Sequence, residues 1–126
     1  MEIDLPDIVA EVAAEFARYE AALVGNDVAA LDALFWQDRR TVRYGGNENL
    51  YGIDEIRAFR QARSAAGLAR QLERTEITTF GRDLAVVSTL FRRDSNRGRI
   101  GRQQQTWARM GPGWRVVAAH ISVIDA

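Results

Sequence analysis

Two polar residues, Arg43 and Tyr19, stand where their side chains could act together on a small ligand. Arg43 interrupts a short apolar strand pattern in the polar segment 39–52, which lies between two stretches of helical periodicity. A guanidinium is always charged and its planar fork fits a carboxylate, so Arg43 could clamp a carboxylate and stabilise negative charge. The alternative is a structural salt bridge to a nearby acid, which could be Asp38, Glu48 or Asp54.

Tyr19 belongs to an apolar stripe at helical spacing, which runs through Ile8, Val12, Phe16, Tyr19 and Leu23. A tyrosine in such a stripe is most often a core residue whose hydroxyl binds a carbonyl. The same hydroxyl could instead donate to a developing oxyanion or protonate a leaving nitrogen. The residues alone leave both interpretations open.

Five further residues are candidates for binding a ligand: His120, Gln103, Gln105, Trp107 and Asn49. His120 is the only histidine, so it could be a general base, a donor to substrate or a structural residue, but not part of a histidine cluster. It shares a strand face with Ser122, and both could face the interior. The two glutamines and Trp107 alternate on one face, which presents amides either to a ligand or to an outer surface. Asn49 follows Glu48 in a predicted loop beside Arg43, at a pocket rim or in solvent.

The composition indicates one ordinary globular domain over residues 1–126. The chain is 47% hydrophobic and 27% charged, with 17 basic and 17 acidic residues. This balance gives no reason to expect nucleic acid or an anionic membrane as a partner. No apolar run reaches the roughly 18 residues of a membrane span, and no basic segment precedes an apolar one as in a signal peptide. We therefore expect a cytoplasmic protein.

Several classes of chemistry lack their motifs. The chain has no cysteine, which excludes a thiol nucleophile and cysteine-based metal sites. It also contains no GxSxG elbow, GxGxxG loop, P-loop or HExxH pair. We therefore expect chemistry without a cofactor or metal.

The first half of the chain has helical periodicity. Asp4, Pro6 and Asp7 favour a helix start, and Gly25 and Asn26 favour its end. Shorter helices are predicted over 28–35 and 53–67, with a strand over 41–44 between them.

From residue 68 the periodicity changes to two, which predicts four antiparallel strands over 68–80, 84–93, 99–110 and 114–123. Helices followed by an antiparallel sheet are typical of an α+β fold. Three helices can cover only one face of this sheet. We expect a curved sheet whose concave face holds the helices and a pocket. A second subunit would then cover outward residues such as Val87, Phe91 and Val117, giving a homodimer.

This order of elements resembles the nuclear transport factor 2-like fold, a cone-shaped α+β barrel shared with SnoaL-like proteins. Within that superfamily, eight short segments resemble the AtzH-like family, and together they span nearly the whole chain. They are Arg18–Leu23, Leu31–Trp36, Arg40–Gly45, Glu48–Gly52, Ser88–Arg93, Gly101–Gln103, Gln105–Trp107 and Gly113–His120.

The resemblance implies breakdown of a small, nitrogen-rich carboxylate. One branch of the AtzH-like family hydrolyses 1,3-dicarboxyurea, another accompanies oxalurate catabolism, and both work beside amidases. In the hydrolase branch a tyrosine of the first helix and an arginine after the second form the proposed catalytic pair, and Tyr19 and Arg43 match those positions. Gln103 and Gln105 could then present amides to a urea-like ligand.

The expectation is thus a cofactor-free hydrolase of a small carboxylated urea or amide. The alternative is a non-catalytic protein that binds a metabolite or assists a partner amidase. A third possibility is a cyclase or isomerase of the wider superfamily, which would need a carboxylate base in the pocket.

Overall fold

The computed structural model describes all residues 1–126 and contains three α-helices, all in the first half of the chain. They are α1 (Pro6–Val24), α2 (Val28–Leu34) and α3 (Ile53–Ala62). Proline stands at the first position of α1, where its missing N–H costs nothing. Asp27 caps α2 by accepting a hydrogen bond from the Ala30 backbone N–H at 3.1 Å.

Six strands form one sheet in the order β2-β1-β6-β5-β4-β3. The strands are β1 (Val42–Tyr44), β2 (Asn49–Tyr51), β3 (Gln71–Phe80), β4 (Leu84–Arg92), β5 (Arg99–Met110) and β6 (Gly113–Asp125). The four long strands form the expected antiparallel meander, and the short 3-10 helix η1 (Asp94–Asn96) lies in the turn between β4 and β5. The hairpin of β1 and β2 extends this sheet, because β1 pairs in parallel with β6.

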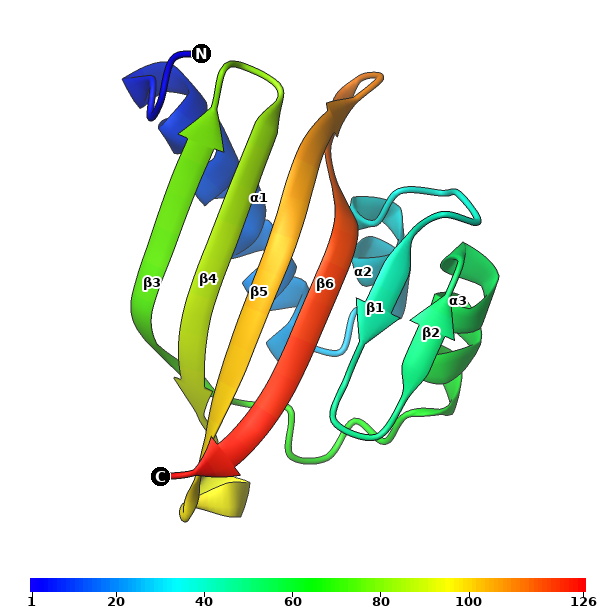
Figure 1. Ribbon diagram of the computed structural model, residues 1–126. Coiled ribbons are helices and arrows are strands. Elements are labelled where there is room, and N and C mark those ends of the chain that lie inside the picture. The colour runs from blue at the N-terminus through cyan, green and yellow to red at the C-terminus, as the bar shows by residue number, and fades with distance from the viewer.

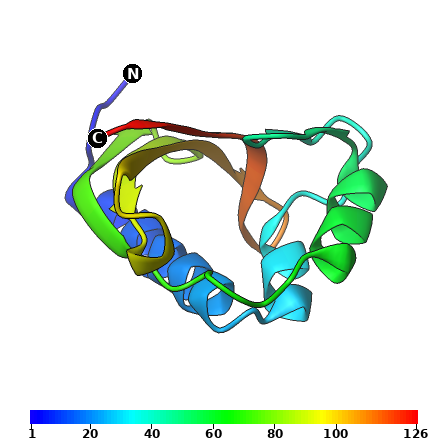
Figure 2. The same cartoon turned by 90° about the horizontal axis from the view of Figure 1, so that it is seen from below.

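The sheet curves around the helices and closes a cone (Figures 1 and 2). Helices α1, α2 and α3 all lie on the concave face, and no helix covers the convex face. Part of the curvature comes from a bulge in β3, where the pairing register shifts between Glu73 and Glu76 and Arg74 has a φ of 52°. The core between helices and sheet includes Ile8, Leu31, Phe35, Ile56, Val87, Trp107 and Val116, all at most 1% exposed.

The α+β, nuclear transport factor 2-like fold expected from the sequence is therefore confirmed, with corrections to some of its elements. Asn49 begins a strand and does not lie in a loop. The third helix ends at Ala62, because Arg63 adopts an extended conformation. Asp4 does not cap α1, since its carboxylate accepts a hydrogen bond from the Thr79 backbone N–H at 2.9 Å.

Val87 and Phe91 were expected on the outer face, and that prediction was wrong. They are 1% and 3% exposed and belong to the buried alternation of β4 on the concave face. Val117 lies at a bulge in β6, between residues paired with Trp107 and Thr106.

Candidate functional site

Tyr19 lies on the inward stripe of α1 and packs among aromatic rings. Its side chain is 3% exposed, and its ring centroid lies 6.4 Å from Phe16, 6.3 Å from Phe35 and 6.4 Å from Trp107. Trp107 meets it edge-on at 87°. Ring packing on three sides fixes where the hydroxyl points. No other protein group forms a hydrogen bond with that hydroxyl, so it can donate to a ligand.

Arg43 points to the concave face from β1 and is 8% exposed. The parallel pairing of β1 with β6 places Arg43 opposite Ala119, and the pairing of β6 with β5 places Ala119 opposite Gln105. Paired residues face the same side of a sheet. Arg43, Ala119 and Gln105 therefore form one row across the concave face.

Arg43 forms the salt bridge to Glu48 that the sequence left open as an alternative. Its Nη1 donates to Glu48 Oε1 at 2.8 Å, and its guanidinium lies over the Phe59 ring, 5.1 Å from the centroid. Gly45 makes this geometry possible, because a Cβ there would collide with the Glu48 carboxylate. Only one of the three guanidinium nitrogens is used, so Nε and Nη2 remain for a ligand.

Gln103 and Gln105 are held with their oxygens bonded and their amide nitrogens free. The Trp107 indole donates to Gln105 Oε1 at 3.1 Å, and Arg70 Nη2 donates to Gln103 Oε1 at 3.1 Å. Gln103 is 3% exposed and Gln105 is 0% exposed, yet the Nε2 of neither residue has a hydrogen-bond partner. Two buried amide groups are thus available as donors.

Four more arginines lie around Tyr19 and Arg43. Arg60 donates to Asp32 at 2.7 Å, and Arg70 forms two hydrogen bonds with Glu20, at 2.8 and 2.6 Å. Arg63 and Arg93 have no carboxylate partner. We call the eight residues of this region the inner polar cluster: Tyr19, Arg43, Arg60, Arg63, Arg70, Arg93, Gln103 and Gln105.

The electrostatics of these arginines reflect burial and mutual repulsion. Burial lowers the pKa of Arg60 below its ordinary value. Burial lowers the pKa of Arg63 too, and the charge of Arg43 lowers it further. The pKa of Arg93 is lowered by burial first and then by the charges of Arg70 and Arg63. The guanidinium groups are therefore close enough to act on one another, and their combined field favours an anion.

Sequence reasoning missed Arg60, Arg63, Arg70 and Arg93 as members of the cluster, although the patterns contained three of them. Arg60 follows Ile56 by four residues and Arg63 follows Phe59 by four, on the inward face of α3 and its continuation. Arg93 follows Phe91 by two residues in the inward alternation of β4.

His120 and Asn49 lie away from the inner polar cluster, and both side chains are exposed. Alternation from Trp114 and Val116 points His120 inward, but the register shift at Val117 reverses the faces, so Ala119 is buried and His120 faces outward. There its ring meets the Tyr44 ring edge-on, with centroids 5.9 Å apart. The expectation that His120 and Ser122 look into the cone is therefore wrong.

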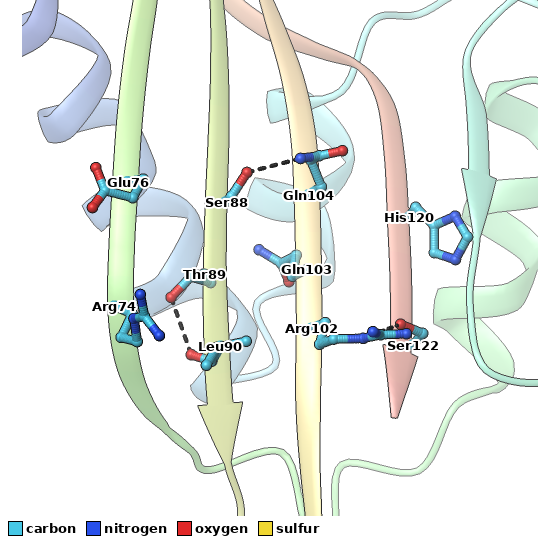
Figure 3. Close-up of a pocket in the computed structure, with 10 residues that line it drawn as sticks. All are labelled: Arg74, Glu76, Ser88, Thr89, Leu90, Arg102, Gln103, Gln104, His120 and Ser122. Carbon is cyan, nitrogen blue, oxygen red and sulfur yellow. Dashed lines mark hydrogen bonds between the residues drawn. The ribbon is translucent and has the colours of Figure 1, made fainter. Parts of the chain in front are cut away.

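The outer face of the sheet carries a groove of about 520 Å³. Figure 3 shows its polar side chains along β3 to β6, with Gln104 donating to the Ser88 hydroxyl at 2.9 Å. The lining includes His120, Arg102 and Ser122, which face away from the cone. This groove opens on the face of the sheet opposite the inner polar cluster, although Gln103 of the cluster is among its lining residues.

No group of three or more histidine, cysteine, aspartate or glutamate side chains is arranged to hold a metal ion. None of the helices combines the length and the apolar character needed to cross a membrane.

Comparison with known proteins gives a family and a fold. The family model described as AtzH-like matches residues 1–126. A protein of unknown function from Pectobacterium atrosepticum, described as belonging to the DUF3225 family, is 59% identical, with a TM-score of 0.95 over 98% of this chain and 95% of that chain. A cystatin-like fold protein from Burkholderia xenovorans is 51% identical, with a TM-score of 0.96 over 100% and 98%.

A more distant structure shows only the fold. An NTF2-like protein of unknown function from Pseudomonas putida is 20% identical, with a TM-score of 0.77 over 90% of this chain and 84% of that chain. A comparison with curated protein sequences gives no significant match.

Proposed function

Since this chain belongs to the AtzH-like family, we propose that it hydrolyses a small carboxylated urea or amide, such as 1,3-dicarboxyurea, in nitrogen catabolism. The observation that carries the proposal is the kind of polar atom that the inner polar cluster leaves without a hydrogen-bond partner. Its buried, unpartnered atoms are nitrogen donors of Arg63, Arg93, Gln103 and Gln105. A ligand that satisfies them must be rich in acceptor oxygens, as carboxylates and urea carbonyls are.

Each polar group has a place in this proposal. Arg43, with two nitrogens not used by Glu48, binds a substrate carboxylate and stabilises negative charge. The Nε2 groups of Gln103 and Gln105 donate to the urea carbonyl oxygen. The Tyr19 hydroxyl donates its proton to the nitrogen of the bond that breaks.

The step balances without an additional reactant other than water. The bond between the carboxyl carbon and the urea nitrogen breaks, the nitrogen takes the Tyr19 proton, and the carboxyl group leaves as carbon dioxide. If water adds to the carboxyl carbon first, it leaves as bicarbonate. Tyr19 regains its proton from solvent. The absence of cysteine and of a serine elbow favours these routes over a covalent intermediate.

The test is turnover of 1,3-dicarboxyurea by the purified protein and by Tyr19→Phe and Arg43→Lys variants. Each should lower kcat/KM by about 10²- to 10³-fold, the usual effect of losing a proton donor or a stabilising charge. Tyr51→Phe is the matched control, because Tyr51 is 55% exposed and bonds only Tyr44 on the outer side of the β1–β2 hairpin. Undiminished turnover of 1,3-dicarboxyurea by both variants would contradict the proposal.

A second candidate, a non-catalytic protein that binds a metabolite or assists a partner amidase, has one observation in its favour. The three carboxylates beside the cluster, Glu48, Asp32 and Glu20, are all paired with arginine. None is free to act as a general base, which also argues against an isomerase or cyclase. An accessory protein would bind the ligand without converting it and would change only the amidase's rate or solubility.

A further inference from the structure

The Gln105 amide is held in one orientation by Trp107. The Trp107 indole N–H donates to Gln105 Oε1 at 3.1 Å, and both side chains are completely buried, at 0% exposed. An indole nitrogen can only donate, whereas an amide has an oxygen that accepts and a nitrogen that donates. A rotated amide would bring two donors together away from water, which is unfavourable. Trp107 thus decides that the oxygen of Gln105 is used and that Nε2 stays free.

The neighbouring strands offer that nitrogen no side chain that accepts a hydrogen bond. Gln105 is paired with Val87 on β4 and with Ala119 on β6, which are 1% and 6% exposed, and both have hydrocarbon side chains. The Nε2 of Gln105 is buried without a hydrogen-bond partner. Because buried amide nitrogens are normally bonded, this one calls for an acceptor that enters from outside the chain.

Gln105 presents this donor beside other groups of the proposed site. The Trp107 ring meets the Tyr19 ring edge-on, with centroids 6.4 Å apart. Ala119 lies between Gln105 and Arg43 in one row across the sheet. Neighbouring strands are about 4.8 Å apart, so about 10 Å separates the backbones of Gln105 and Arg43, and within the row only a methyl group projects between them. A small ligand whose carboxylate binds Arg43 can therefore place a second polar atom at Gln105 Nε2.

Of the three consecutive glutamines in β5, the two that face inward have the same polarity. Arg70 can only donate, and its Nη2 binds Gln103 Oε1 at 3.1 Å, which leaves Gln103 Nε2 without a partner. Gln104 lies between them on the outer face and is bonded to the Ser88 hydroxyl (Figure 3). A hydroxyl can donate or accept, so it does not dictate the orientation of the Gln104 amide. Only the inward amides are fixed as donors by their partners.

We propose that Trp107 is a positioning residue that determines specificity. By fixing Gln105 as a donor, it selects a ligand with a carbonyl oxygen over an isosteric ligand with a nitrogen donor at the same place. This rests on the proposed function in one respect, namely that a small carboxylate occupies the inner polar cluster. Urea and amide groups satisfy the Gln105 nitrogen, whereas guanidino groups bring a second donor against it. Such discrimination is strong, because the wrong ligand leaves a buried polar group unpaired.

The test compares the affinities of hydantoate and guanidinoacetate, measured by isothermal titration calorimetry. The two molecules have the same shape and differ in one group, which is a urea carbonyl oxygen in hydantoate and a protonated nitrogen in guanidinoacetate. A CH2 group separates the carboxylate of each from nitrogen, so the proposed reaction cannot remove it. The native protein should bind hydantoate at least about tenfold more tightly. We call this ratio of affinities the carbonyl preference.

Trp107→Phe removes the indole N–H and keeps an aromatic ring beside Tyr19. The Gln105 amide is then free to rotate, and the carbonyl preference should fall at least about fivefold. A loss of packing alone would weaken both ligands together and leave the preference unchanged. Trp114→Phe is the matched control, because Trp114 is also buried and its indole donates to Glu11 at 3.1 Å, outside the inner polar cluster. This control should change the carbonyl preference less than about twofold.

Gln105→Glu tests the donor itself and leaves the indole bonded. Glutamate has the same shape, keeps an oxygen for Trp107 and puts a second oxygen where Nε2 was. The carbonyl preference should fall at least about tenfold, because the new oxygen accepts from guanidinoacetate and repels the carbonyl oxygen of hydantoate. Gln104→Glu is the matched control, since it adds the same charge one residue away on the outer face. It should leave the preference within about twofold of the native value.

An unchanged carbonyl preference in Trp107→Phe would overturn the inference, and so would an unchanged preference in Gln105→Glu. Equal affinity for the two ligands in the native protein, or binding of neither, would do the same. A control that loses the preference as fully as its partner variant would also contradict the inference, because stability or net charge would then be the cause. If Trp107→Phe does not fold, benzothienylalanine at residue 107 keeps the ring size and replaces the indole N–H by sulfur, and the same comparison applies.

The inference and the proposed function can fail separately. Hydrolysis of 1,3-dicarboxyurea by a protein whose carbonyl preference does not depend on Trp107 would defeat only the inference. A carbonyl preference that depends on Trp107, in a protein that does not hydrolyse 1,3-dicarboxyurea, would defeat only the catalytic proposal.

Discussion

At the scale of single residues, the inner polar cluster is organised by which atoms are already bonded. Glu48 takes one nitrogen of Arg43 and fixes the direction of the guanidinium, so the remaining two nitrogens face a defined position. Trp107 and Arg70 do the same for the two glutamines by binding their oxygens. A site whose donors are fixed before the ligand arrives loses little entropy on binding.

Gln103 and Gln105 allow a stability measurement that separates a ligand role from a structural one. In Gln103→Met the unpartnered amide disappears, and Arg70 keeps both bonds to Glu20, so the free energy of unfolding should stay the same or rise by up to about 1 kcal/mol. In Gln105→Met the Trp107 indole loses its acceptor, and unfolding should become easier by about 1–3 kcal/mol.

Denaturant unfolding of the two methionine variants gives these values, and calorimetry with malonate, a carboxylate that the proposed reaction cannot cleave, gives their affinities. Both variants should bind at least about tenfold less tightly, because each loses a donor to the ligand. A Gln103→Met protein that is as stable as the native one and binds equally well would show that the free amide serves no ligand.

Much of the residue-level site follows from periodicity. The inward stripe of α1 predicts Tyr19 buried, and alternation in β5 groups Gln103, Gln105 and Trp107 on one face, although the sequence left open which face it was. The salt bridge of Arg43 was one of three open pairings, and only the tertiary structure selects Glu48. Arg93 is the last residue of a predicted strand, and only the tertiary structure places its guanidinium over the Phe91 ring.

At the scale of elements, the cone depends on a close approach between β4 and β5. Gly101 pairs with Phe91, and a Cβ on Gly101 would collide with the Phe91 ring. That ring supports the guanidinium groups of Arg70 and Arg93. The absence of a side chain at residue 101 therefore positions part of the inner polar cluster.

Gly101→Ala should displace Phe91 and lower the free energy of unfolding by about 1–3 kcal/mol, as overpacking does. Gly98→Ala is the control, because a Cβ there meets nothing within 4 Å. Urea unfolding of both variants gives the two values, and a malonate titration shows whether the displaced arginines still bind. Equal stability of the two variants would mean that the Phe91 ring moves freely and does not hold the arginines in place.

Elements of regular length could be predicted from the sequence, whereas short ones and local shifts could not. The four long strands have enough alternation to define them, but β2 covers only Asn49–Tyr51 and is a strand because β1 pairs with it. The parallel pairing of β1 with β6 joins residues about 75 positions apart, which no local pattern contains. The position of His120 was likewise absent from the local pattern. The single extra residue at the Val117 bulge reverses the alternation after it and places His120 on the outer face.

At the scale of the whole molecule, the helices cover one face of the sheet and leave the other open (Figure 2). The open face carries charges of both signs, with Glu76 on β3 and Arg102 on β5, and neither forms a salt bridge within the chain (Figure 3). Around a two-fold axis, a face with both signs can pair its acids with the bases of a second copy. We therefore propose that a second copy of this chain covers the outer groove.

The corresponding prediction is a homodimer in solution whose stability depends on these charges. Size-exclusion chromatography with light scattering should give about twice the chain mass of 14.1 kDa for the native protein. Glu76→Arg makes the face uniformly positive and should shift the protein toward monomer, while Glu76→Arg combined with Arg102→Glu should restore the dimer by exchanging the two signs.

Asp54→Arg, at an exposed position of α3 on the other side of the sheet, is the control and should leave the dimer intact. A native protein that elutes as a monomer at micromolar concentration contradicts the proposal. So does a double variant that dissociates as fully as the single one, because rescue requires that the two residues meet across the interface.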